Sequence, residues 1–284
     1  MTLHIAVELG DAPLAEAGER AEAAGAAFVT LDDSPLYSGR PRIEAGVRAA
    51  WLARRAARVG IAPTLPVTTT EPFHLATQLA SLDHVSRGRA GWVVAAPNTA
   101  AALATVGRTP IEPNALRQEV ADVIGVARGL WDSWEDGAVI RDVASGRFLD
   151  RDKVHHVDFE GATFSIAGPL ITPRPPQGQV VVIGADTLGV TELLDVALIA
   201  APTLAEVERR ASAARSAGAP LVFADLVAAG SLGADEPLLE RLDGIVDGVR
   251  MRLGDPAGGR DLHRTSTLRE VLGLPRPVNR FAAV

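Results

Sequence analysis

The alternation of short, continuously apolar runs with longer Ala-, Arg- and Glu-rich stretches constrains the fold most strongly. An unbroken apolar run is typical of a parallel strand that is covered on both faces. Eight such runs predict strands: His4–Leu9, Ala27–Leu31, Val59–Leu65, Gly91–Ala96, Val180–Gly184, Val196–Ala200, Leu221–Val227 and Gly244–Met251. Five intervening stretches predict helices from helical spacing and capping residues: Pro13–Gly25, Arg42–Arg58, Glu71–Ser86, Pro113–Trp134 and Leu204–Ala217.

Eight strands separated by helices favour an α/β fold of the (β/α)8 barrel type. An open doubly wound sheet is the alternative, but Glu8-Leu9-Gly10-Asp11 after the first strand offers no glycine-rich dinucleotide loop. Residues 137–178 break the alternation and predict a small hairpin excursion before the fifth strand. Residues 267–284 predict a C-terminal tail that wraps the surface. We find no linker or internal repeat, so residues 1–284 predict a single domain.

Composition excludes several classes of chemistry. The net charge of −7 argues against nucleic acid as a partner, and the absence of cysteine excludes disulfides, thiolate metal sites and a cysteine nucleophile. Lys153, the single lysine, lies in the polar excursion, which disfavours Schiff-base chemistry. The six histidines include no H-x-H pair on a strand, so we expect no metal site. No apolar run approaches the ~20 residues of a membrane span and no signal pattern is present, so we expect a cytoplasmic protein.

A barrel of this kind carries its active site at the C-terminal ends of its strands. Polar residues at these positions are Asp32, Asp33, Thr64, Thr68, Thr69, Thr70, Asn98, Asp186, Thr187, Asp225 and Asp247. Asp32 with Asp225 or Asp247 could form a carboxylate pair of the glycosidase type, although acidic residues are common at barrel rims. Pro72 follows the Thr-rich segment and marks the start of a helix. The segment therefore indicates either a helix cap with hydroxyls in the loop before it, or a polar wall around a flat ligand.

Five blocks of sequence resemble a known family and follow its order. They are EPFHLATQLASLDHVSRGRAGW (71–92), LWDSWED (130–136), KVHHVDFEG (153–161), GPLITPRPPQG (168–178) and TLREVLGLPRPVNRFA (267–282). On these blocks the chain is identified as a shortened and diverged member of the bacterial luciferase-like flavin-dependent monooxygenases. Within that family it is similar to the nitrilotriacetate monooxygenase component A and dibenzothiophene-sulfone monooxygenase group. The shortening falls between Ala200 and Gly244, after the sixth strand.

The resemblance implies a (β/α)8 barrel that uses reduced FMN, supplied by a separate flavin reductase, to oxidise a small organic substrate. It also implies a homodimer. Carried over residue by residue, it places cofactor contacts at Asp32, Thr68, Trp92, Arg117, Gly184 and Asp186, and a candidate catalytic residue at His74.

Three positions depart from the family pattern at the flavin site. Val182 stands where relatives carry a glutamine, Asp186 where they carry a phosphate-binding serine, and Arg117 where they carry a tyrosine. A carboxylate at Asp186 would repel a phosphate, unless Arg117 pairs with the phosphate or with Asp186 itself.

Three functions therefore stay open. The first is an FMN-dependent monooxygenase, and the second is a flavin-free barrel that acts as a partner subunit or binding protein. The third is a deazaflavin-dependent oxidoreductase with a phosphate site rebuilt at Gly230–Gly233.

Overall fold

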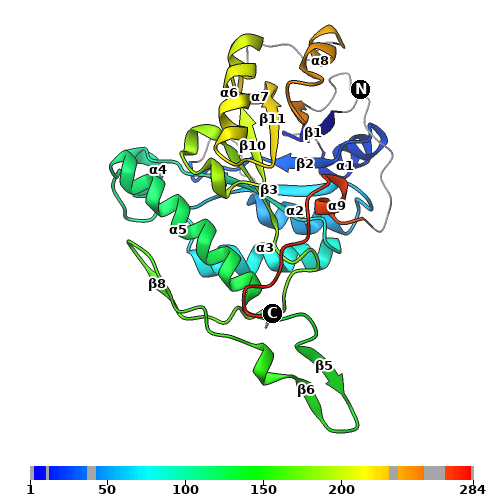
Figure 1. The fold of residues 1–284 in the computed structure, drawn as a ribbon, viewed down its shortest axis with the longest axis vertical. Helices are drawn as coiled ribbons and strands as arrows, with labels where there is room; N and C mark the ends of the chain where they lie inside the picture. The colour runs from blue at the N-terminus through cyan, green and yellow to red at the C-terminus, as the bar shows by residue number, and fades with distance from the viewer. Residues whose placement is uncertain (1–2, 11–12, 37–42, 230–235, 253–265, 283–284) are drawn as a thin grey trace.

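Eight parallel strands close into a barrel in the computed structural model, which describes residues 3–10, 13–36, 43–229, 236–252 and 266–282 (Figure 1). In spatial order around the barrel the strands are β1 (His4–Glu8), β12 (Gly248–Arg252), β11 (Leu221–Asp225), β10 (Val196–Ile199), β9 (Val181–Ala185), β4 (Gly91–Ala95), β3 (Gly60–Pro66) and β2 (Phe28–Leu31). Each predicted strand is confirmed, and the largest shift is in the last one, which begins at Gly248 rather than Gly244. The first and last strands pair in parallel, so the sheet is closed and the open doubly wound alternative is excluded.

The five predicted helices are also confirmed. They are α1 (Leu14–Ala23), α2 (Ala45–Ala53), α3 (Pro72–Ser86), α5 (Pro113–Asp132) and α6 (Leu204–Ser216), with the shorter helices α4 (Ala100–Ala104), α7 (Leu226–Ala229), α8 (Glu236–Leu242) and α9 (Leu268–Val271). Local sequence sets their starts. The Glu71 carboxylate accepts hydrogen bonds from the first free N–H groups of α3, and Pro72 occupies the first turn. No helix in the described ranges is both long and apolar enough to cross a membrane.

Alternate strand residues face either the barrel interior or the surrounding helices. The interior cluster contains Phe28 and Phe223, and the outer cluster contains Trp92. Leu268 of α9 belongs to the interior cluster and packs against Gly60 and Gly91, the first residues of β3 and β4. The segment containing α9 therefore closes the N-terminal end of the barrel, and the C-terminal strand ends are left for a site.

The excursion forms two hairpins where the sequence predicted one. They are β5 (Val139–Asp142) with β6 (Arg147–Leu149), and β7 (Phe159–Glu160) with β8 (Ser165–Ile166). The first hairpin projects away from the barrel (Figure 1). The second is held to α5, because Asp122 Oδ2 accepts a hydrogen bond of 2.8 Å from the N–H of Ala162.

Candidate functional site

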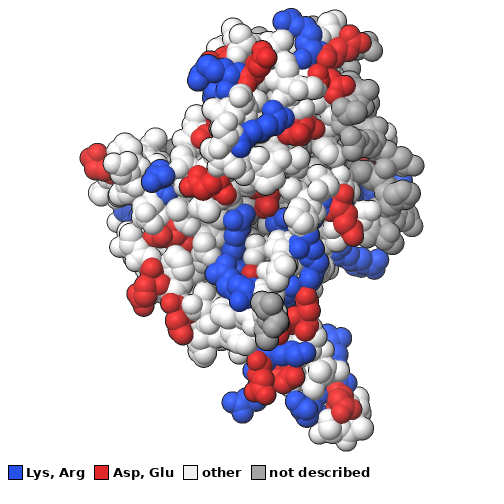
Figure 2. Space-filling view, in the orientation of Figure 1, with Lys and Arg blue, Asp and Glu red and all other residues white. Residues whose placement is uncertain are grey.

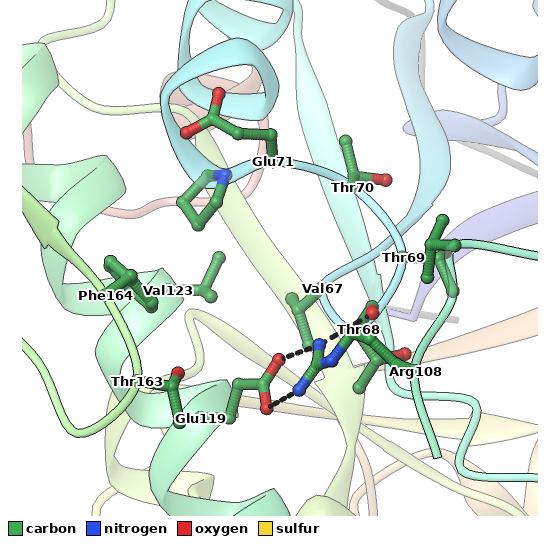
Figure 3. A pocket seen from close by; sticks show the side chains of 12 residues that line it. Val67, Thr68, Thr69, Thr70, Glu71, Arg108, Glu119, Val123, Thr163 and Phe164 are labelled. Carbon is green, nitrogen blue, oxygen red and sulfur yellow. Dashed lines mark hydrogen bonds and ion pairs between the residues drawn. The ribbon is translucent and has the colours of Figure 1, made fainter. Parts of the chain in front are cut away.

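A cavity of about 410 Å3 opens at the C-terminal end of β3 (Figure 3). Its walls come from the loop after β3, the segment after α4, helix α5 and the β7–β8 turn: Val67, Thr68, Thr69, Thr70, Glu71, Pro72, Val106, Arg108, Glu119, Val123, Thr163 and Phe164. The volume lies in the range of small-molecule sites. A second cavity of about 370 Å3 shares Thr69, Thr70 and Val106 with it and reaches Asp33 on the loop after β2. The threonine segment thus lines both cavities.

Three charged groups line the first cavity: Arg108 and Glu119 form an ion pair, and the Glu71 carboxylate caps α3. Arg108 Nη1 and Nη2 lie 2.6 and 2.7 Å from the two carboxylate oxygens of Glu119, and Nη1 also donates to the Thr68 carbonyl oxygen at 2.8 Å (Figure 3). Hydrogen bonding to Glu119 raises the pKa of Arg108. The Thr68 hydroxyl donates to the Pro97 carbonyl. Because the cation of the cavity is already paired, the valine, threonine and phenylalanine lining suits a neutral organic molecule better than an anion.

A second polar group lies inside the barrel at the ends of β1, β2, β11 and β12. Arg250 Nη2 donates to Glu8 at 2.5 Å, Nη1 donates to both Asp225 oxygens at 3.0 and 2.8 Å, and Nε donates to the Thr30 hydroxyl at 3.1 Å. Burial lowers the pKa of Arg250, but the charges of Asp225 and Glu8 and their hydrogen bonds outweigh it and raise the pKa above its ordinary value. Two carboxylates share one guanidinium. The sequence analysis named Asp225 as a candidate but missed Glu8 and Arg250. A charged residue near the end of an apolar strand is the signal that could have identified them.

The loop after β9 holds an ion pair that the sequence did not predict. Asp186 is bound by Arg210 of α6 through Nε at 2.9 Å and Nη2 at 2.5 Å, and Arg210 Nη1 donates to the Ala200 carbonyl at 2.7 Å. Hydrogen bonding to Asp186 raises the pKa of Arg210. Arg117 instead donates to the Gly189 carbonyl at 3.2 Å. Of the two alternatives given for Arg117, the one in which it pairs with Asp186 is therefore wrong, because Asp186 pairs with Arg210.

This loop does not fit an FMN phosphate in its present arrangement. A phosphate at Asp186 would meet a carboxylate, and the neighbouring cation Arg210 is already neutralised. Gly184 leaves no open space for a phosphate either, because a Cβ there would lie 3.0 Å from the side chains of Leu188 and Leu194, which already pack against it.

On the visible face as a whole, basic and acidic side chains are interspersed (Figure 2).

The other predicted site residues fall in different surroundings. Trp92 is fully buried in the outer cluster, where its ring N–H donates to the Leu65 carbonyl at 3.1 Å, so it presents no surface to a ligand at the barrel mouth. Asp32 is exposed after β2, and its N–H lies 3.3 Å from Glu8 Oε1. His74 is exposed in the first turn of α3 and lines neither cavity described above.

Of two further aspartates predicted at the barrel rim, Asp33 lines the second cavity and Asp247 lies elsewhere. Asp33 accepts from the N–H of Ala45 at 2.5 Å and so fixes the start of α2. Asp247 precedes β12 and accepts from the N–H of Val222 at 2.8 Å near the start of β11, so it lies at the N-terminal end of the barrel, away from the candidate site. Gly230–Gly233 lie outside the described residues.

The structure therefore does not bring the predicted residues together in one site. Thr68 lies at the β3 cavity, and Asp225 belongs to the polar group inside the barrel. Arg117, Gly184 and Asp186 lie around β9 and the loop that follows it.

Comparison with known proteins gives a family match over most of the chain. Residues 10–232 match the sequence profile described as luciferase-like monooxygenase. The chain is 42% identical over 139 residues to the N-acetyl-S-(2-succino)cysteine monooxygenase of Bacillus subtilis (strain 168), a match covering 49% of this chain and 32% of that protein. The nitrilotriacetate and dibenzothiophene-sulfone monooxygenases also match, so the resemblance stated from the sequence is confirmed. The chain thus spans about a third of the length of several relatives that it matches.

One relative matches along almost its whole length. It is a subunit of the pristinamycin IIA synthase of Streptomyces pristinaespiralis, 34% identical over 270 residues, which cover 92% of this chain and 88% of that protein. Another subunit of the same synthase matches at 36% identity over 105 residues, covering 37% of this chain and 20% of that longer protein. Among solved structures, a long-chain alkane monooxygenase superimposes with a TM-score of 0.71 at 20% identity, over 86% of this chain and 68% of that one. At that identity the superposition shows the shared fold alone.

Proposed function

Because the chain belongs to the luciferase-like monooxygenase family, we propose that it is one subunit of a flavin-dependent monooxygenase whose other subunit is a longer luciferase-like chain. The observation that carries the proposal is the extent of the matches. The shorter of the two pristinamycin IIA synthase relatives is covered to 88% of its length, whereas the nitrilotriacetate monooxygenase component A is covered to 30%. The longer relative from that synthase is also similar to this chain, which supports a pair of homologous barrels.

The geometry supports a neutral small organic molecule as the ligand of this subunit. The 410 Å3 cavity combines threonine hydroxyls with Val67, Val123 and Phe164, and its single ion pair, Arg108 with Glu119, is internally satisfied. Reduced flavin would come from a separate flavin reductase, as the family resemblance implies.

The alternative is that the chain works without a second, longer chain, as an FMN-dependent homodimer. The cavity at the C-terminal end of β3 favours it, because barrel enzymes bind substrates at that face. The deazaflavin alternative depends on Gly230–Gly233 and gains no support from the described residues.

The test is co-expression with a longer luciferase-like chain encoded by the same organism. We expect light scattering after size-exclusion chromatography to show a one-to-one complex. Product formation from a panel of neutral organic substrates, followed by mass spectrometry with reduced FMN and a reductase, should require both chains. Full turnover by this chain alone as a homodimer would instead support the FMN-dependent alternative.

A further inference from the structure

We propose that the Asp186–Arg210 ion pair takes the place of a cofactor phosphate on the loop after β9, so that this chain gives FMN no advantage over riboflavin. The inference deepens the proposed function, on which it rests, because it says that this subunit does not supply the phosphate site of the flavin. It concerns the isolated protein, so it can be tested whether or not a complex forms.

The hydrogen bonds that Arg210 makes to Asp186 resemble those that it would make to a bound phosphate. Its Nε and Nη2 groups form a parallel pair of hydrogen bonds to the two Asp186 oxygens, which is the geometry in which a guanidinium binds a planar or tetrahedral oxyanion. Nη1 is held by the Ala200 carbonyl, which fixes the plane of the guanidinium. An anion supplied by the chain itself thus satisfies the cation.

Burial makes this pair more than a surface contact. The Arg210 and Asp186 side chains are only 19% and 14% exposed. A phosphate dianion would have to displace the carboxylate from Arg210 and leave it partly buried without a partner, which is unfavourable. Arg117, another cation near this loop, is exposed and donates to the Gly189 carbonyl.

The same helix provides a matched control. Arg209 and Glu206 form an ion pair with nearly the same bond lengths, 2.9 and 2.5 Å, but the Arg209 side chain is 67% exposed. Removing that carboxylate changes the net charge by the same amount as removing Asp186. It leaves the Asp186–Arg210 hydrogen bonds in place, so it shows what the loss of a nearby negative charge does by itself, because the charge of Glu206 also acts on Arg210.

The experiment compares FMN with riboflavin, which differ only in the phosphate. Binding of each, oxidised and chemically reduced, is measured by fluorescence quenching or absorbance for the wild type, Asp186→Ser and Asp186→Asn. The controls are Glu206→Gln and the double variant Asp186→Ser/Arg210→Gln. Circular dichroism and thermal melts verify that each variant is folded.

We expect the wild type to bind the two flavins with affinities within about twofold, or to bind neither. Asp186→Ser should favour FMN over riboflavin by about tenfold to a hundredfold, since a charge-assisted contact to phosphate is then available. The Glu206→Gln and double variants should behave like the wild type.

Three results would overturn the inference. They are a wild type that binds FMN tenfold tighter than riboflavin, a folded Asp186→Ser and Asp186→Asn that both gain no FMN preference, or a Glu206→Gln variant that gains as much. None of these results depends on whether the chain assembles with a longer partner, so failure of the inference is distinguishable from failure of the proposed function.

Discussion

Replacing Arg250 by methionine should destabilise the barrel by about 3–5 kcal/mol at pH 7, the range for removing one partner of a buried ion pair. The side chain makes three hydrogen bonds to carboxylate oxygens, and Glu8 and Asp225 are only 7% and 5% exposed. At an effective dielectric of about 20, each contact at ~4 Å is worth about 4 kcal/mol before desolvation is counted. Methionine fills much of the volume, so the loss comes mainly from two carboxylates that neither water nor a cation can satisfy.

Urea denaturation at pH 7 measures this effect. The matched control, Glu8→Gln/Asp225→Asn/Arg250→Met, removes all three charges and should recover most of the lost free energy. A loss below about 1 kcal/mol at pH 7, or the same loss in the single and triple variants, would refute the reasoning.

Three further predictions concern stability. Burial raises the pKa of Asp83 from 3.8 to about 6, so the stability that this group contributes is complete below pH 3.8 and is lost as the pH rises through 6. The free energy of unfolding should fall by up to about 3 kcal/mol over that interval. Urea titrations across this pH range should show that Asp83→Asn flattens the pH dependence of the free energy of unfolding. A Cβ at Gly248 would lie 2.7 Å from the His4 carbonyl oxygen, so Gly248→Ala should lower the free energy of unfolding by about 1–3 kcal/mol. A Cβ at Gly125 in α5 has room, so Gly125→Ala should raise the free energy of unfolding by about 0.5–1 kcal/mol. Equal effects of the two substitutions in calorimetry would contradict this reasoning. Leu268→Ala, which opens the closed end of the barrel, should cost about 2–5 kcal/mol in the same assay, and a loss under 1 kcal/mol would show that α9 does not seal the interior.

Local signals in the sequence predicted the barrel elements because those signals act over short distances. Continuous apolar runs located the strands, and Glu71 with Pro72 or Thr203 located helix starts whose caps the structure confirms. The excursion was recognised, but its two hairpins were predicted as one, because strands of two to four residues are too short to show where one hairpin ends and the next begins.

The candidate site was predicted less well, and Trp92 shows why. A strand covered on both faces is apolar on both faces, so its pattern cannot tell which residues face the barrel interior. Trp92 was assigned to the flavin on resemblance, and the structure places it against the helices. Arg210 was missed because its partner Asp186 lies 24 residues away on another element.

The sequence by itself thus determined the order and kind of the elements, the helix caps, the absence of cysteine chemistry and the family. Only the tertiary structure decided which charges meet. Arg250 and Glu8 are 242 residues apart and touch because closure of the barrel sets the first strand beside the last. The Arg210–Asp186 pair likewise forms only because helix α6, which packs on β10 and β11, reaches the loop after β9. Such contacts depend on the register and facing of distant strands, which local propensity does not encode.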